Sequence, residues 1–216
     1  MGASQTPESV AARLRDQFAP SYLTLTSIIQ GVALSALVIR VESVGELLDL
    51  SGWLLVAATV LSLFLIWHEY LMQALAYVWL PTLLDSAVPF AFLVAELFLT
   101  HFVYGSQRAW LLAAAVAFAL GVAANIWWRT QTSRDRRRNA GVVEALGDYA
   151  RVRLVLAIVP IPIFLAAWAF YDLLGLDQAS VLVSAGALLI VLISIAGTVP
   201  YWDRVLAYAR REQPAG

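Results

Sequence analysis

Residues 53–104 read WLLVAATVLSLFLIWHEYLMQALAYVWLPTLLDSAVPFAFLVAELFLTHFVY, and this segment decides the class of the fold. Its apolar residues form long runs, and a run of about 18 or more is enough to cross a bilayer as a helix. The whole chain continues the pattern, since 61% of its 216 residues are hydrophobic and 13% are charged. Soluble domains average about 45–50% apolar and about 25% charged residues. The composition therefore excludes a soluble enzyme, a disordered chain and a secreted disulfide scaffold, and it predicts an all-α, polytopic membrane protein.

Six apolar stretches are long enough to span the roughly 30 Å hydrocarbon core as helices. The first lies at 21–40, the second starts near residue 51, and the third ends near residue 104. The other three lie at 109–128, 153–173 and 179–200. Tryptophans stand at the ends of these stretches, where an aromatic belt would place them. We therefore expect a domain of six transmembrane helices over residues 20–203, followed by a tail at 204–216.

The N-terminal segment 1–19 is polar and contains no signal-peptide core. Thr6, Pro7 and Glu8 form a good helix start, because Thr caps a helix and Pro and an acid suit its first turn. Apolar residues then recur at helical spacing. The pattern predicts a short amphipathic helix over about 7–18 on the membrane surface, with a mobile terminus as the alternative.

Residues 68–88 allow two interpretations, because polar groups interrupt the apolar run and no basic loop separates it from the next helix. In the first, the second helix continues to about Tyr77 and the chain turns at Pro81. In the second, that helix ends near His68, and 69–84 form an interfacial or re-entrant segment. We favour the long, tilted helix.

Charge is distributed unevenly between the predicted loops. Arginines gather at the N-terminus, in the loop 129–153 and in the C-terminal tail, whereas the segments after the first and fifth helices are mainly acidic. Six crossings place all three basic segments on one side and both acidic segments on the other. The positive-inside rule then predicts an integral plasma (inner) membrane protein with both termini in the cytoplasm.

Ionisable groups at membrane depth are costly, so they are the first candidates for function. In the third helix, Asp85, Glu96 and Thr100 fall on one face, and Glu96 lies near the middle of the span. This face suggests the wall of a cation or proton pathway. The alternatives are a protonated Glu96 bonded to a neighbouring helix and an Asp85 that caps the helix.

The second helix carries His68 and Glu69 side by side. If the second and third helices form a hairpin that turns near residue 80, these residues lie within about one turn of Glu96 along the axis. We therefore expect His68, Glu69 and Glu96 to meet in one polar cluster, as a proton relay or ion site. The alternative is that His68 and Glu69 mark the membrane interface.

The first helix has a face of small and polar residues that includes Gly31, with Gln30 beside it. Such a face is typical of helix packing, and a pore lining is the functional alternative. Gly31 resembles the last residue of the Phe-Ser-Asp-Gly motif of the lysosomal-type potassium channels. Ile28, Ile29 and Gln30 replace the other three residues, so no activity is carried over from that family.

The strongest charge cluster is the run Arg134, Arg136, Arg137 and Arg138. It is typical of a topology determinant in contact with anionic lipid headgroups, and a docking site for an acidic partner is the alternative. No aromatic platform accompanies the run, so nucleic acid is not expected as a partner.

Catalytic signatures are missing from the sequence. The chain contains neither cysteine nor lysine, and it has no H-E-x-x-H, G-x-S-x-G or G-x-G-x-x-G pattern. We expect no enzyme activity, cofactor or metal site. The first hypothesis is a homo-oligomeric ion or proton pathway that uses Glu96, Glu69, His68, Asp85 and Gln30. The second is a non-conducting membrane anchor that recruits a cytoplasmic protein or anionic lipid through the arginine loop.

Overall fold

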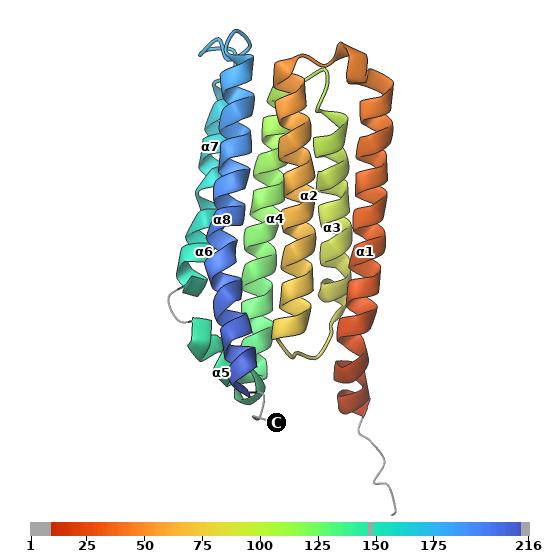
Figure 1. The fold of residues 1–216 in the computed structure, drawn as a ribbon, viewed down its shortest axis with the longest axis vertical. Helices are drawn as coiled ribbons and strands as arrows, with labels where there is room; N and C mark the ends of the chain where they lie inside the picture. The colour runs from red at the N-terminus through yellow and green to blue at the C-terminus, as the bar shows by residue number, and fades with distance from the viewer. Residues whose placement is uncertain (1–9, 147–148, 213–216) are drawn as a thin grey trace, which may run out of the picture.

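The computed structural model describes residues 10–146 and 149–212, and these residues form a bundle of α-helices (Figure 1). No strand occurs within these two ranges. In chain order the elements are α1 (Val10–Val44), the 3₁₀ helix η1 (Gly45–Leu47), α2 (Leu50–Ala76), α3 (Leu83–His101), α4 (Gln107–Arg134), α5 (Arg136–Leu146), α6 (Tyr149–Ile158), α7 (Pro160–Ala169) and α8 (Ser180–Glu212).

The long helices run side by side along the length of the bundle (Figure 1). Helix α1 packs against α2 and α3, α2 packs against α8, and α4 packs against α3 and α7. By contrast, α4 and α8 make few contacts with each other. The first helix begins and the last one ends at the same end of the bundle, which also carries α5 (Figure 1).

Six helical segments are long and apolar enough to cross a membrane, which confirms the predicted number of spans. They are Asp16–Leu47, Leu50–Ala76, Leu83–His101, Gln107–Arg134, Ala150–Ala169 and Ser180–Arg211. Many large apolar side chains on these helices are exposed, among them Ile39, Phe98 and Leu182. Contact of such a surface with lipid tails costs little free energy, whereas its exposure to water is unfavourable.

The connection between α2 and α3 takes the long-helix form. Helix α2 continues to Ala76, and a short non-helical linker, residues 77–82, leads into α3. The linker is held by Asn139 of α5, whose Oδ1 accepts from the Val78 amide at 2.9 Å and whose Nδ2 donates to the Val78 carbonyl at 2.8 Å. These two bonds fix the linker against the arginine-rich loop.

Two elements differ in extent from the sequence prediction. The helix expected at 7–18 is continuous with the first span from Val10 onward, and residues 7–9 lie outside the described ranges. The fifth span is divided at Val159 into α6 and α7. Pro160 explains the break, because proline has no amide hydrogen and its ring clashes with the preceding turn.

The interior contains two main groups of packed side chains. The larger one is centred on Trp110, which is fully buried and donates from Nε1 to Thr59 Oγ1 at 3.0 Å. The second is aromatic and places Tyr70 edge-to-face against Phe92 and Trp128. The indole bond gives this buried donor an acceptor within the chain, which a donor away from water needs.

Helix α2 begins at a side-chain cap. Asp49 Oδ1 accepts from the Gly52 amide at 2.8 Å and from Ser51 Oγ at 2.9 Å. The Gly52 N–H is the main cause that holds the pKa of Asp49 below its usual range, because the bond favours the charged carboxylate.

We expect Asp49→Ala to lower the free energy of unfolding by about 1 kcal/mol at pH 7, the usual cost of losing an N-cap. This corresponds to a fall of about 2–4 °C in Tm for a chain of this size. Because folding lowers the pKa of Asp49, its contribution is complete above the unfolded value of about 3.9 and is lost as the pH falls through the folded value. The Tm difference from wild type, measured in detergent, should therefore shrink below about pH 4. Glu42→Ala, at an exposed position, is the control and should change Tm little at either pH.

Candidate functional site

Glu96 of α3 is fully buried and faces α1. Gln30 of α1 donates from Nε2 to Glu96 Oε1 at 2.6 Å, and Gln30 is itself buried. Thirteen residues separate Glu96 from the start of α3 at Leu83, so its Cα lies about 20 Å along the helix. The second carboxyl oxygen, Oε2, is buried and has no hydrogen-bond partner in the described part of the chain. The carboxyl group therefore keeps capacity for a further proton or donor.

Three buried hydroxyl groups between α1, α2 and α3 also lack a partner among the described residues. They belong to Thr100, one turn after Glu96, and to Tyr70 and Tyr22, whose rings are 5.8 Å apart. Tyr70 is close enough to Glu96 to interact with it electrostatically, as is Tyr22 with Asp85. We refer to these polar groups together as the α1–α3 polar column; its members are Asp85, Tyr22, Tyr70, Glu96 and Thr100.

Asp85 lies at the start of α3 and is fully buried. Its Oδ2 accepts from the amide and the hydroxyl of Thr82, both at 2.7 Å, and its Oδ1 accepts from Trp127 Nε1 at 3.2 Å. Thr82 is the N-cap residue, and Asp85 occupies the third position of the capping box. Asp85 therefore does cap the start of α3, as one alternative from the sequence predicted, but the N-cap position itself is occupied by Thr82.

Glu69 belongs to a different cluster, on the side of α2 that faces α6 and α8. It forms an ion pair with Arg153 of α6, whose side chain is only 9% exposed. The Gln73 amide, turned so that its oxygen faces the guanidinium, accepts from Arg153 Nη1 at 2.8 Å. Glu69 lies about 10 Å inside the end of α2, so this charge is compensated within the membrane-spanning segment.

Aromatic rings complete the surroundings of Arg153. Its guanidinium carbon lies 4.6 Å from the ring centroid of Tyr201 and 5.9 Å from that of Trp202, both in α8. His68 is half-buried, and its ring packs edge-on to Trp202 at 6.0 Å. Cation–π contact with desolvated rings stabilises a buried guanidinium further.

His68, Glu69 and Glu96 do not meet in one cluster. Glu69 pairs with Arg153, while Glu96 pairs with Gln30 on the other side of α2. The prediction considered only the height of His68 and Glu69 along the helix axis relative to Glu96. Neighbouring residues on a helix point about 100° apart, so residues at a similar height can face different helices. On α2 it is Tyr70, next to Glu69, that belongs to the α1–α3 polar column.

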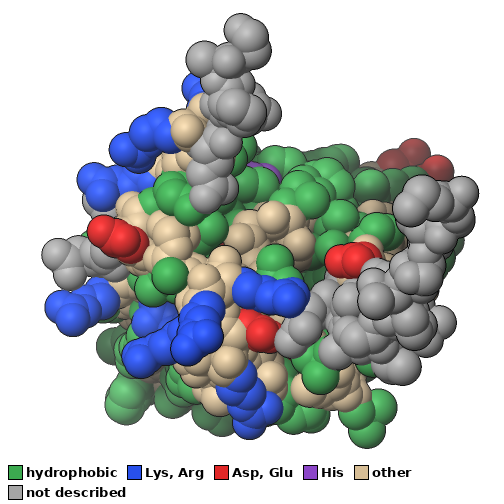
Figure 2. All heavy atoms as spheres, turned by 90° about the horizontal axis from the view of Figure 1, so that it is seen from below, with side chains coloured by type: hydrophobic (Ala, Val, Ile, Leu, Met, Phe, Trp, Pro, Cys, Tyr) green, Lys and Arg blue, Asp and Glu red, His purple; other side chains and the backbone are tan. Residues whose placement is uncertain are grey.

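The arginine run lies at one end of the bundle. Figure 2 shows this end directly, with arginine side chains gathered over one part of it. Arg134, Arg136, Arg137 and Arg138 are all exposed, and Arg134 donates from Nη1 to Gln131 Oε1 at 3.1 Å. Their contact with lipid or with a partner protein stays a prediction.

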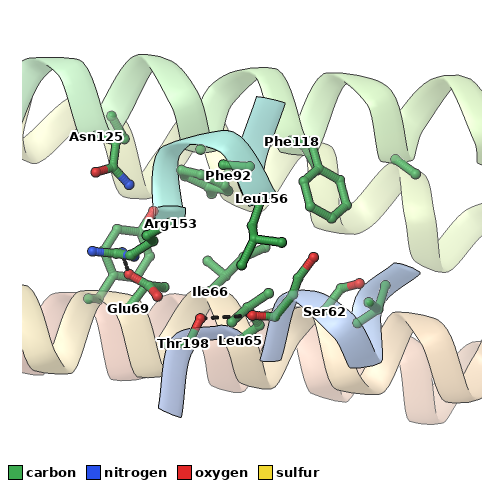
Figure 3. Close-up of a pocket in the computed structure, with 18 of the residues that line it drawn as sticks. Ser62, Leu65, Ile66, Glu69, Phe92, Phe118, Asn125, Arg153, Leu156 and Thr198 are labelled. Atoms are coloured by element: carbon green, nitrogen blue, oxygen red, sulfur yellow. Dashed lines mark hydrogen bonds and ion pairs between the residues drawn. The ribbon is translucent and has the colours of Figure 1, made fainter. Parts of the chain in front are cut away.

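Two cavities lie between α2, α4, α6 and α8. The apolar compartment has a volume of 110 Å³, and its wall includes Leu65, Phe92, Phe118 and Leu156 (Figure 3). The basic compartment, nearer to α5, has a volume of 510 Å³, and its wall carries Arg129, Arg136 and Glu144. The walls of both include Asn125, Trp128 and Arg153.

Sequence reasoning missed three contributors to these clusters. Arg153 was counted with the loop arginines, although it directly adjoins the fifth apolar stretch. The sequence pattern assigns no site role to Tyr70 or Tyr201. Their position within apolar runs was the available signal, because a polar tip inside a span needs a partner.

No cluster of three or more His, Asp or Glu side chains that could hold a metal ion occurs within residues 10–146 and 149–212. Comparison with known proteins adds no relative: no family model matches the chain, and no similar chain was found among curated proteins or solved structures.

The Glu69–Arg153 pair predicts a strong coupling between two substitutions. Arg153→Leu leaves Glu69 as a buried charge without its partner, which typically costs about 3–5 kcal/mol of unfolding free energy. The double variant Glu69→Leu/Arg153→Leu removes both charges and should recover a large part of that loss. The measurement is Tm in detergent for wild type, both single variants and the double variant. Losses that simply add in the double variant would show that the two groups do not interact, and Arg137→Leu, at an exposed position, serves as the control.

Proposed function

We propose that the protein moves protons across the membrane along the α1–α3 polar column. The observation that carries this proposal is Glu96, a fully buried carboxyl group deep in a spanning helix, with one oxygen that has no partner among the described residues. A charge at this depth costs several kcal/mol. A carboxyl group there can exchange between a neutral and a charged form as its surroundings change, which is the requirement for a proton relay.

The surroundings of Glu96 suit a proton better than a metal cation. A hard cation such as Ca²⁺ takes about six to eight oxygen ligands, and Mg²⁺ takes six. Here the nearest polar neighbour, Gln30, presents its NH₂ group to the carboxylate and donates rather than ligates. Hydroxyl groups, such as those of Tyr70 and Thr100, both donate and accept, so they can pass a proton on.

The column also has end groups of suitable chemistry. Asp85 lies near the end of the bundle that carries α5. Tyr22 interacts electrostatically with Asp85 and with Tyr70, and Tyr70 interacts with Glu96. Thr100 continues the column toward the opposite end, where the neighbouring His101 is exposed. Ordered water would complete the gaps between these groups, as it does between buried polar atoms generally.

The pathway proposed here lies inside one chain, because Glu96 and Gln30 face each other between α1 and α3. A second copy is therefore not needed to supply its walls. The homo-oligomer expected from the sequence stays a prediction, as does the absence of a cofactor.

The second candidate function is recruitment of an acidic cytoplasmic protein by the arginine run. The exposure of Arg136, Arg137 and Arg138 at one end of the bundle favours it. Neutralising the three residues should abolish capture of such a partner while proton flux, if it depends on Glu96, stays unchanged.

We expect Glu96→Gln to reduce proton flux at least tenfold, because the amide cannot release a proton. The measurement uses purified protein in liposomes with a trapped pH-sensitive dye and a potassium diffusion potential set by valinomycin. Glu46→Gln, at an exposed position in η1, is the matched control and should conduct like wild type. Wild-type flux no greater than that of empty liposomes, or unchanged flux in Glu96→Gln, would refute the proposal.

We further propose that the end of the bundle with α5 faces the cytoplasm, together with both termini. The exposed arginines gather at this end, whereas Glu42, Glu46 and Asp49 lie at the connection between α1 and α2. The positive-inside rule then gives the orientation.

This orientation can be tested directly, because the chain contains no cysteine. In cells whose outer envelope is permeabilised while the membrane that holds the protein stays sealed, a membrane-impermeant maleimide should label Glu46→Cys. Arg137→Cys should be labelled only after the membrane is broken. The reverse pattern would invert the proposed orientation, and the unsubstituted protein provides the background.

A further inference from the structure

The two cavities between α2, α4, α6 and α8 form one hollow with two chemically different ends. Their walls share Asn125, Trp128 and Arg153, so the apolar and basic compartments meet at these residues. Figure 3 shows Asn125 and Arg153 at one end of the apolar compartment and Phe118 toward the other. Seven residues of α4 separate Phe118 from Asn125, a distance of about 10 Å along the helix.

Small residues on α4 account for the apolar compartment. Ala114, Ala117, Gly121 and Ala124 all contribute to its wall, and their spacing puts them on one face of the helix. A Cβ atom added at Gly121 would come no closer than 4.0 Å to the Phe92 ring, so space remains at this position. The few contacts between α4 and α8 are consistent with a hollow between them.

The charge of the basic compartment is not balanced within its wall. Arg153 is neutralised by Glu69, which leaves Arg129 and Arg136 facing the single carboxylate of Glu144. Arg129 donates to the Ala150 carbonyl, which carries no formal charge. Arg136 has no ion-pair partner within the described ranges. The wall thus retains an excess positive charge.

An unpartnered donor lies where the two compartments meet. The Trp128 side chain is 4% exposed and belongs to both walls, and its Nε1 has no acceptor among the described residues. A buried indole N–H usually bonds to an oxygen, and leaving it unsatisfied is costly. An acceptor oxygen supplied by a ligand at this junction would remove that cost.

We propose that this hollow binds an amphiphilic organic anion, with its carboxylate or phosphate against Arg129, Arg136 and Trp128 and its apolar end among Phe118 and Leu156. The basic compartment falls within the roughly 300–1,000 Å³ of typical ligand pockets. The apolar compartment approaches the size of engineered apolar cavities of about 150 Å³, which stay dry and bind benzene. It accommodates a short part of an alkyl chain or one ring.

The binding experiment uses the full chain in zwitterionic nanodiscs and isothermal titration calorimetry, with empty nanodiscs to subtract partition into lipid. The probes are decanoate and decyl phosphate, with decanol, acetate and inorganic phosphate as comparison compounds. We expect at least one of the two amphiphilic anions to bind saturably, and at least tenfold more tightly than decanol and than the chainless anion with the same head group. Equal binding of acetate or inorganic phosphate would instead indicate a simple anion site, and equal binding of decanol would indicate an apolar site. Either result overturns the proposal.

Two variants test the two ends of the hollow separately, each with a matched control. Arg136→Gln should weaken binding about tenfold, in line with the loss of a charge-assisted bond. Arg137→Gln, next to it but outside the cavity wall, should leave Kd within about twofold. Gly121→Leu fills the apolar compartment and should weaken the amphiphiles at least tenfold, whereas Gly31→Leu, at an exposed position with no atom near its added Cβ, should not.

Each variant is first checked for a Tm within a few degrees of wild type. Equal losses in Arg136→Gln and Arg137→Gln, or unchanged binding in both Arg136→Gln and Gly121→Leu, would refute the site. The proposal does not rest on proton movement, because Glu96 and Gln30 do not line the hollow. Tyr70 belongs to both regions but takes no part in the proposed contacts with the anion. A failure of one therefore leaves the other standing.

Discussion

Polar groups within the apolar thickness of this bundle gain hydrogen bonds only from the chain itself or from water, because lipid tails offer none. This constraint decides which helices lie together. Gln30 ties α1 to α3 through Glu96, and Thr59 ties α2 to α4 through Trp110. The apolar outer surface contributes little to the choice of neighbours, since lipid competes for it on equal terms. The internal polar contacts and close packing therefore specify the arrangement.

Helix α2 separates two polar regions of opposite character. On one side the column around Glu96 contains hydroxyls and a carboxyl oxygen that have no partner in residues 10–146 and 149–212, so it retains capacity for protons or water. On the other side Glu69 and Arg153 are mutually neutralised and enclosed by aromatic rings. The first region keeps unused hydrogen-bonding capacity and is suited to proton transfer, whereas in the second the two charges neutralise each other and stabilise the fold. Tyr70 touches both, since it belongs to the column and to the wall of the apolar compartment.

The sequence predicted the spans well, because run length and apolar content depend on the bilayer and not on neighbouring helices. It also singled out Glu96 and Gln30 as polar groups within the predicted spans, and the structure shows that they face each other. It did not predict the partner of Glu69. That pairing depends on how α2 is rotated and on which helix lies beside it, and both follow from packing across the whole bundle. Arg153 was misplaced for the same reason, since only its contact with α2 distinguishes it from the loop arginines.

The Glu69–Arg153 pair has a consequence for the biosynthesis of the chain. Translation proceeds at about 5–20 residues per second, so α2 leaves the ribosome several seconds before α6 does. During that interval Glu69 lacks Arg153, its partner in the folded chain, and a charged α2 inserts into lipid at a penalty. That penalty is removed once Arg153 of α6 pairs with Glu69. We therefore expect α6 to complete the insertion of α2, because its arrival supplies the guanidinium that neutralises Glu69.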